Sequence, residues 1–178
     1  MKRTTYINMI DRVRERPLLT KAITYSNSLI TKAIYLAYPC LLIALILQPD
    51  AYETLISAPL SSSFLQALLV PFVSFILLSL FRRAVNAPRP YEVFDHPSLI
   101  SKDTHGKSFP SRHVFSIFII GTTFLFSCPI PGPGIVILCL GILLAGLRVV
   151  SGIHFPRDVI VGALIGIGAA MLGFGILN

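Results

Sequence analysis

The chain has 178 residues, 54% of them hydrophobic and only 13% charged, and it carries a formal net charge of +7. Charged residues make up about 25% of an average soluble domain, so this composition excludes an ordinary soluble protein. The mean hydropathy of +0.77 leads to the same conclusion. We therefore expect apolar runs of about 20 residues, the length that a helix needs to cross a bilayer.

Residues 1–27 form a basic segment before the first apolar run. A helix over residues 4–16 would separate its apolar and charged side chains, with Tyr6, Met9, Ile10 and Val13 on one face and Arg12, Arg14, Glu15 and Arg16 on the other. This pattern predicts an amphipathic helix that lies on the membrane surface and ends at Pro17, with a frayed tail as the alternative. No apolar stretch follows Lys2 and Arg3, so we expect no cleavable signal peptide.

Five apolar runs follow, each long enough or nearly long enough to span a bilayer: 28–47, 64–81, 114–130, 135–150 and 159–177. The sequence therefore predicts an all-α fold, a polytopic transmembrane helical bundle with five spans plus the amphipathic surface segment. In this interpretation residues 1–27 are an N-terminal segment and residues 28–178 form the membrane-embedded domain.

The last run carries small residues at intervals of three to four positions: Gly162, Gly166, Ala170 and Gly173. Such spacing is typical of helices that pack closely in membranes. We expect this face to be used inside the bundle, and self-association into a homo-oligomer is the alternative.

The positive charges gather on one side of the predicted bundle. Six of the fifteen Lys and Arg residues precede Ser28, and six more lie between Arg82 and Arg112. With five crossings, both regions face the same side as residues 148–158. The positive-inside rule makes this the cytoplasmic side, in the inner membrane of a bacterium, although a sixth crossing would reverse the assignment.

Three polar clusters fall on that same side, at residues 82–90, 110–113 and 148–158. Arginine presents a planar fork of donors that suits a tetrahedral phosphate. The first and third clusters supply three such residues: Arg82, Arg89 and Arg148. The sequence therefore predicts a phosphate site at this face of the membrane.

The second cluster, "PSRH", opens the third span. Ser111 suits the N-cap position, next to the unpaired N–H groups of the first helical turn, and a helix N-terminus is itself an anion site. His113 lies on the same turn, close enough to protonate an oxygen that leaves the bound phosphorus. We expect this helix start to be a phosphate cradle that carries a general acid.

His154 and Asp158 are four residues apart at the start of the last span. Pro156 suits the first helical position, which puts Asp158 in the first turn and His154 just before it. A carboxylate there can bond one imidazole nitrogen, set the tautomer and leave the other nitrogen to attack phosphorus. The pair predicts a nucleophile or base with an orienting acid.

Each of these residues also has a purely structural explanation. Arginines at helix ends snorkel to lipid headgroups, His113 could be an interfacial histidine, and Asp158 could complement the helix dipole. Their coincidence on one membrane face favours a catalytic site. The sequence shows neither metal-ligand spacing nor a disulfide pattern, so we expect no metal and no cofactor.

The order of the clusters resembles the type-2 phosphatidic acid phosphatases, the lipid phosphate phosphatase family. That family carries Lys-x6-Arg-Pro, then Pro-Ser-Gly-His, then Ser-Arg-x5-His-x3-Asp. This chain has Arg82-x6-Arg89-Pro90, then Pro110-Ser111-Arg112-His113, then Leu147-Arg148-x5-His154-x3-Asp158. The resemblance spans residues 64–177 and also implies a six-span bundle, of which the first span is here reduced to the surface segment.

The resemblance implies a role for each matching position. His154 would be the nucleophile that forms a phosphohistidine, Asp158 would orient it, and His113 would protonate the leaving group. The implied phosphate ligands, which require no metal, are Arg89, Ser111 and Arg148.

Three positions depart from the family pattern. Arg82 replaces a lysine and keeps its charge, while Leu147 replaces a serine. Arg112 replaces a glycine and adds a cation that could contact a second phosphate or a headgroup. None of these departures removes a catalytic group, so activity is still expected.

We therefore expect an integral-membrane phosphatase whose partner is a lipid phosphate in the bilayer and not a nucleic acid. Its substrate would be a phosphomonoester or pyrophosphate of the undecaprenyl pyrophosphate, phosphatidylglycerophosphate or phosphatidic acid type. A lipid phosphotransferase on the same site and a non-catalytic protein that binds anionic lipids are the alternatives. The stretch 91–109 is expected to cover the site.

Overall fold

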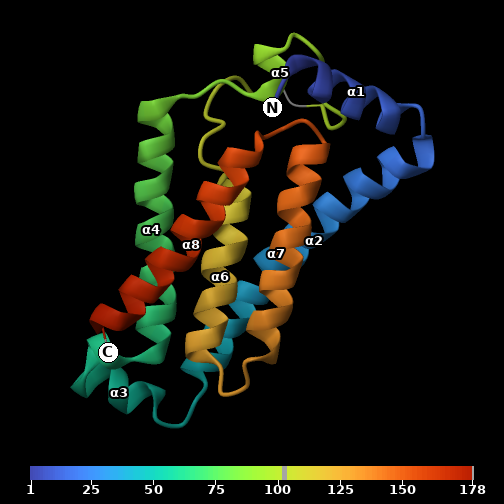
Figure 1. Cartoon of the computed structure of the whole chain (residues 1–178). Helices are drawn as coiled ribbons and strands as arrows, with labels where there is room; N and C mark the ends of the chain where they lie inside the picture. The colour runs from blue at the N-terminus through green and yellow to red at the C-terminus, as the bar shows by residue number, and fades with distance from the viewer. Residues whose placement is uncertain (102–103, 178) are drawn as a thin grey trace.

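The computed structural model describes residues 1–101 and 104–177, which form helices joined by loops (Figure 1). Five long helices correspond in order to the five predicted spans: α2 (Pro17–Ile46), α4 (Ser63–Val85), α6 (Arg112–Ser127), α7 (Gly132–Val150) and α8 (Pro156–Leu177). The short elements are α1 (Arg3–Arg14), α3 (Ala51–Ser57), the 3₁₀ turn η1 (Pro59–Ser61) and α5 (Pro90–Val93). The predicted all-α transmembrane bundle is confirmed.

Helix α6 lies at the centre of the bundle and packs against α2, α4, α7 and α8. Its residues from 114 to 124 are all buried. A Cβ on Gly162 of α8 would lie 2.7 Å from the carbonyl oxygen of Ser111, and one on Gly166 would lie 2.7 Å from that of Phe115. The small residues of the last span therefore allow α8 to approach α6 closely, inside the bundle as predicted.

Four of the long helices, α2, α4, α7 and α8, are long and apolar enough to cross a bilayer by themselves. Helix α6 has 16 residues, about 24 Å at 1.5 Å per residue, and is shorter than the roughly 30 Å hydrocarbon core. Because its neighbours surround it, α6 can begin below their ends. Figure 1 shows the yellow-green loop before α6 descending between the helices, so the start of α6 is recessed.

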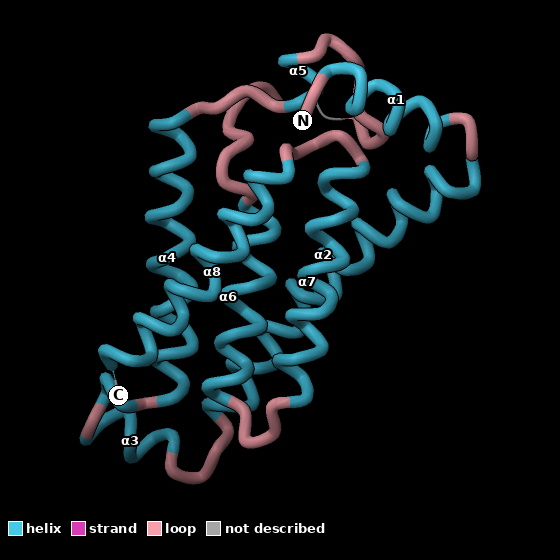
Figure 2. Tube along the Cα trace, viewed as in Figure 1, coloured by secondary structure: helices cyan, strands magenta, loops and turns pink. Residues whose placement is uncertain are grey.

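The loops lie in two groups at opposite ends of the bundle (Figure 2). One end carries α1, α5 and the loop segments 86–89, 94–101, 104–111 and 151–155, and the other carries α3, η1 and the turn 128–131. The second end has no Lys or Arg in residues 47–62 or in the turn. The predicted alternation of five crossings therefore brings all three polar clusters to one end.

Helix α1 matches the predicted amphipathic segment, but its apolar face packs against protein. Tyr6 and Ile10 are fully buried, and the Tyr6 hydroxyl donates to the carbonyl oxygens of His96 at 3.2 Å and Gly152 at 3.4 Å. Gly152 has a φ of +76°, and a Cβ there would lie 2.7 Å from the Tyr6 hydroxyl, so glycine is what permits this approach. Amphipathicity alone does not distinguish a protein surface from a lipid surface.

The first span begins earlier than predicted. Helix α2 starts at Pro17, so the boundary between residues 27 and 28 falls inside one continuous helix. Thr, Lys, Ser and Asn side chains between residues 20 and 28 lower the hydropathy there. They do not break a helix that begins with proline at a preorganised first position.

Candidate active site

Asp158 and His154 form a buried pair where α7 turns into α8. Helix α8 begins at Pro156, as predicted, and Asp158 Oδ2 accepts a 3.0 Å hydrogen bond from the backbone N–H of Phe155, half of a capping box. The same oxygen lies 3.5 Å from His154 Nδ1, and the two side chains are 0% and 2% exposed. The start of the helix thus fixes the carboxylate beside the imidazole.

Ser108 contacts both members of this pair and is not among the predicted site residues. Its hydroxyl donates a 2.5 Å hydrogen bond to Asp158 Oδ2 and lies 3.4 Å from His154 Nδ1. Its backbone N–H donates to the carbonyl oxygen of Ala87 at 2.8 Å, which ties the loop before α6 to the loop after α4. The one sequence signal is its place three residues before Ser111, and that position does not reveal its partners.

Burial lowers the pKa of His154 to about 4; Asp158 acts in the opposite direction, and the positive charges of Arg89 and Arg148 add to the decrease. The imidazole is therefore neutral at pH 7, the form that a nucleophile requires. Because Nδ1 faces Asp158 and Ser108, Nε2 is the nitrogen on the side away from the carboxylate.

Arg82 and Arg89 are buried, and the loop before α6 positions both guanidinium groups. Arg82 donates to the carbonyl oxygens of Lys107 and Ser108, the second at 3.5 Å. Arg89 Nε donates to the carbonyl oxygen of Gly106 at 3.0 Å. A guanidinium has five N–H donors, so these contacts leave donors on each residue for an anionic ligand.

Glu92 holds that loop in place. Its carboxylate accepts hydrogen bonds from the backbone N–H of Arg89 at 2.7 Å and of Gly106 at 3.0 Å. Burial acts to raise the pKa of Glu92, but these hydrogen bonds outweigh it and lower that pKa below its ordinary value. The stretch 91–109 thus contacts the site arginines through the backbone carbonyl oxygens of its residues 106–108. Its residues 102 and 103 lie outside the described parts of the chain.

Two buried donors of the site, the Ser111 hydroxyl and Arg148 Nε, have no hydrogen-bond partner among the described residues, and the same holds for the acceptor Asp158 Oδ1. Ser111 occupies the N-cap position of α6, as predicted, but its hydroxyl makes no capping bond. A buried polar group without a partner costs about 1–3 kcal/mol. An anionic ligand that accepts hydrogen bonds from both donors would remove that cost for them.

The first turn of α6 presents its other two predicted site residues to different helices. The Arg112 guanidinium lies 5.6 Å from the ring centre of Phe75 on α4 and is exposed. His113 lines a small cavity with Tyr35 of α2 and Ser116 of α6. The cation therefore lies on the α4 side of the helix start and the imidazole on the α2 side.

The predicted site residues come from the three clusters, and the structure brings the arginines, Ser111, His154 and Asp158 to one recessed region. His113 instead lines the separate small cavity beside α2. Arg89 and Arg112 lie close enough for their charges to act on Arg82, and Arg89 acts in the same way on Arg148 and His154. Within residues 1–101 and 104–177, no three His, Cys, Asp or Glu side chains form a cluster that could hold a metal. This arrangement can hold a tetrahedral oxyanion beside a neutral imidazole.

Comparisons with known proteins agree with the fold. The chain superimposes on the crystal structure of Aquifex aeolicus LpxE with a TM-score of 0.67 and 25% identity, over 97% of this chain and 93% of that one. A second crystal structure, of the first transmembrane PAP2 type phosphatidylglycerolphosphate phosphatase from Bacillus subtilis, gives a TM-score of 0.62 and 20% identity, over 97% and 84%.

No curated protein matches the chain by sequence. The family model of the PAP2 superfamily, however, matches residues 63–178, which include all three clusters. The resemblance to the type-2 phosphatidic acid phosphatases is therefore confirmed, and the chain belongs to the PAP2 superfamily.

Proposed function

We propose that the chain is an integral-membrane phosphatase that hydrolyses a lipid phosphomonoester or pyrophosphate through a phosphohistidine intermediate, without a metal ion. The family and the fold support a membrane lipid phosphatase. One observation carries the finer proposal: the buried His154–Asp158 pair lies in a group of cationic side chains with two unpartnered donors, on Ser111 and Arg148.

The phosphate group of the substrate would be held by side chains that are already positioned before it binds. Arg82 and Arg89 are fixed by loop carbonyls, and the N–H groups of the first turn of α6 add an anion site. Preorganised positive charge of this kind stabilises the charge on the transferring phosphoryl group. The full set of proposed ligands is Arg82, Arg89, Ser111, Arg112 and Arg148.

In the first step, His154 Nε2 forms a bond to phosphorus while the P–O bond to the lipid breaks. The electron pair of that bond moves to the leaving oxygen, which takes a proton from His113. In the second step, water attacks the phosphohistidine, the P–N bond breaks, and inorganic phosphate leaves with His154 restored. Asp158 keeps the Nδ1 side of the ring oriented in both steps.

Candidate substrates are of the undecaprenyl pyrophosphate, phosphatidylglycerophosphate or phosphatidic acid type, because each presents a phosphate at the depth of a recessed site. We place the protein in the inner membrane of a bacterium, with the site on the cytoplasmic face. A topology reporter fused at Asn178 should lie on the side opposite the active site. Both termini on one side would contradict the five-span arrangement.

The test is release of inorganic phosphate from lipid phosphates by the purified protein in detergent, with EDTA present. We expect EDTA to leave the rate unchanged and His154→Ala to lower it at least ~10³-fold, as nucleophile removal does elsewhere. His96→Ala, at the α1 contact, is the matched control and should keep most of the activity. Undiminished turnover by His154→Ala would falsify the nucleophile assignment, and a metal that restores activity lost in EDTA would refute metal independence.

Two alternatives make different predictions. A phosphotransferase would give a phosphorylated acceptor instead of inorganic phosphate when candidate acceptor lipids are added. A non-catalytic protein that binds anionic lipids would lose binding when the arginines are changed. It would show no phosphate release, with or without changes at His113 and His154.

A further inference from the structure

A cavity of about 510 Å³ opens at the loop end of the bundle, beside the proposed site. Three of the proposed phosphate ligands line it: Arg82, Arg89 and Arg112. Its volume lies within the roughly 300–1,000 Å³ of pockets that hold whole small ligands. A single phosphate group therefore leaves most of the cavity unfilled.

Arg112 shares the cavity with two further cations, Arg83 and Lys107. All three are exposed, and no carboxylate is among the described residues that line the cavity. Within the described parts of the chain, none of the three forms an ion pair with Asp or Glu. Clustered like charges without a counterion repel one another, and a wall of one sign attracts a ligand of the opposite sign.

The local structure keeps these cations at the cavity. Arg83 follows Arg82 in the last turn of α4. Lys107 lies in a turn with a φ of +52°, and its backbone carbonyl oxygen accepts a hydrogen bond from Arg82. The Arg112 guanidinium rests over the Phe75 ring. The three cations thus belong to the same elements that position the phosphate site.

We propose that Arg83, Lys107 and Arg112 form a second anion subsite, and that the substrate is a lipid diphosphate whose second phosphate occupies it. This inference rests on the proposed function and specifies its substrate class. The terminal phosphate would lie against His154, and Arg82 and Arg89 would contact both phosphates because they line the cavity as well as the site.

The second subsite changes the chemistry of the leaving group. His154 Nε2 bonds to the terminal phosphorus, the P–O bond to the bridging oxygen breaks, and the electron pair stays on that oxygen, now part of a lipid monophosphate. A phosphate monoester has a second pKa near 6, so this leaving group needs less help from a general acid than an alkoxide does. Water then releases the terminal phosphate from His154.

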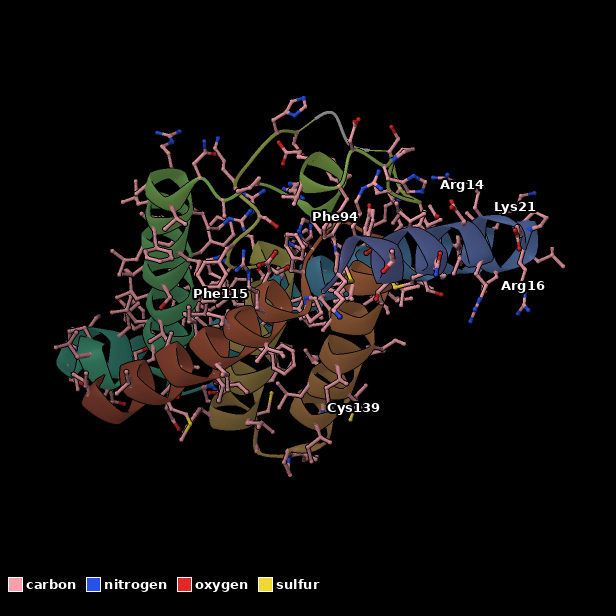
Figure 3. All side chains as sticks on the ribbon, turned by 45° about the horizontal axis from the view of Figure 1, so that its top comes forward. Arg14, Arg16, Lys21, Phe94, Phe115 and Cys139 are labelled. Atoms are coloured by element: carbon pink, nitrogen blue, oxygen red, sulfur yellow. The ribbon has the colours of Figure 1, made fainter. Side chains whose placement is uncertain are left out.

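The experiment compares farnesyl diphosphate with farnesyl monophosphate, two substrates with the same tail, in detergent micelles. We expect the wild-type protein to give the higher kcat/KM for the diphosphate. Arg83→Gln and Lys107→Gln should each lower the ratio of the two kcat/KM values by about two- to fivefold, the upper part of the range for one exposed charge pair. Arg16→Gln changes a basic residue at the N-cap of α2, away from Phe115 of the central helix (Figure 3), and should leave the ratio unchanged.

A second arm tests whether the cavity takes a separate phosphate ion. Inorganic pyrophosphate should inhibit the wild-type protein more strongly than inorganic phosphate does, and the two variants should reduce that difference. If the variants weaken inhibition by inorganic phosphate alone and leave the substrate ratio unchanged, the cavity binds a free ion and the proposal is wrong. Equal losses on both farnesyl substrates would also overturn it.

The failure of this proposal can be told apart from the failure of the proposed function. Hydrolysis of the monophosphate that depends on His154, with a substrate ratio insensitive to Arg83 and Lys107, overturns the second subsite alone. No hydrolysis of either substrate by the wild-type protein overturns both. His113→Ala adds an independent check, because it should slow the monophosphate reaction at least tenfold more than the diphosphate reaction.

Discussion

The buried half of the site and its exposed half are built on different principles. His154, Asp158 and Ser108 hold one another at 2.5–3.5 Å and are shielded from water. Arg83 and Lys107 are exposed at the rim of the cavity. A buried polar group that loses its partner has no water to replace it, whereas an exposed cation remains hydrated. Substitutions should therefore affect the chemical step most in the buried half and substrate selectivity most at the rim.

Asp158→Asn should give the largest effect among residues that act through His154. The amide keeps the shape of the side chain and can still accept the hydrogen bonds from Ser108 and the Phe155 N–H, but it no longer stabilises the required imidazole tautomer. Equivalent changes in other catalytic systems cost about 10⁴-fold in kcat, and we expect on the order of 10²–10⁴-fold here. Steady-state phosphate release in detergent measures this loss.

Asp50→Asn is the matched control, because Asp50 precedes α3 at the opposite end of the bundle and is exposed. It should keep the wild-type rate. If Asp158→Asn lowers kcat less than threefold while the folded fraction is unchanged, the carboxylate does not orient the nucleophile. The buried half of the site would then not affect the chemical step more than the exposed half does.

Ser108→Ala should have a smaller effect, about tenfold in kcat with little change in KM, because one neutral-to-charged hydrogen bond is worth about 1.5–3 kcal/mol at most. The pH profile separates positioning from general damage. In the wild-type protein, kcat should fall on the acidic side of the pH–rate profile (the acidic limb) near pH 4, where the buried imidazole of His154 takes up a proton. Without the bond from Ser108, Asp158 acts more strongly on His154, so we expect that pKa to rise and the limb to move to higher pH.

Ser98→Ala removes a hydroxyl of the same covering loop, where it donates to the carbonyl oxygen of Ile100 at 2.7 Å. This control should leave kcat and the acidic limb as in the wild type. A Ser108→Ala variant with lowered kcat but an unmoved limb would indicate that the hydroxyl supports the loop only.

The sequence predicted the bundle and the partners within each cluster for a physical reason: both depend on short-range spacing. Apolar runs of bilayer length mark spans, and a four-residue interval with proline between places His154 beside Asp158 at a helix start. The three clusters could be joined because alternating spans bring every second loop to the same face. Short-range spacing was thus enough to predict most of the helices and most residues of the proposed site.

The features that the sequence did not predict are contacts between distant loops. Ser108 reaches Asp158 across 50 positions, and nothing near Ser108 in the chain signals that contact. Tyr6 contacts Gly152 across 146 positions in the sequence. Without knowledge of that contact, the apolar face of α1 is expected to bind lipid. Such contacts depend on how loops fold over the bundle, and loop conformation leaves no periodic pattern.

Gly152→Ala tests whether α1 braces the buried half, and it should give the smallest loss of activity among these changes. The new Cβ would lie 2.7 Å from the Tyr6 hydroxyl and 2.8 Å from Ile10 Cδ1, at a φ of +76° that disfavours alanine. Backbone strain of this kind costs about 1–2 kcal/mol. We expect the Tm in detergent to fall by about 2–8 °C and activity to fall a few-fold, since His154 is two residues away. Gly168→Ala, at a helical glycine whose Cβ would meet nothing within 4 Å, should keep both the Tm and the activity. If Gly152→Ala lowers the Tm but leaves kcat intact, α1 stabilises the fold without positioning His154, and the buried half of the site ends at its own hydrogen bonds.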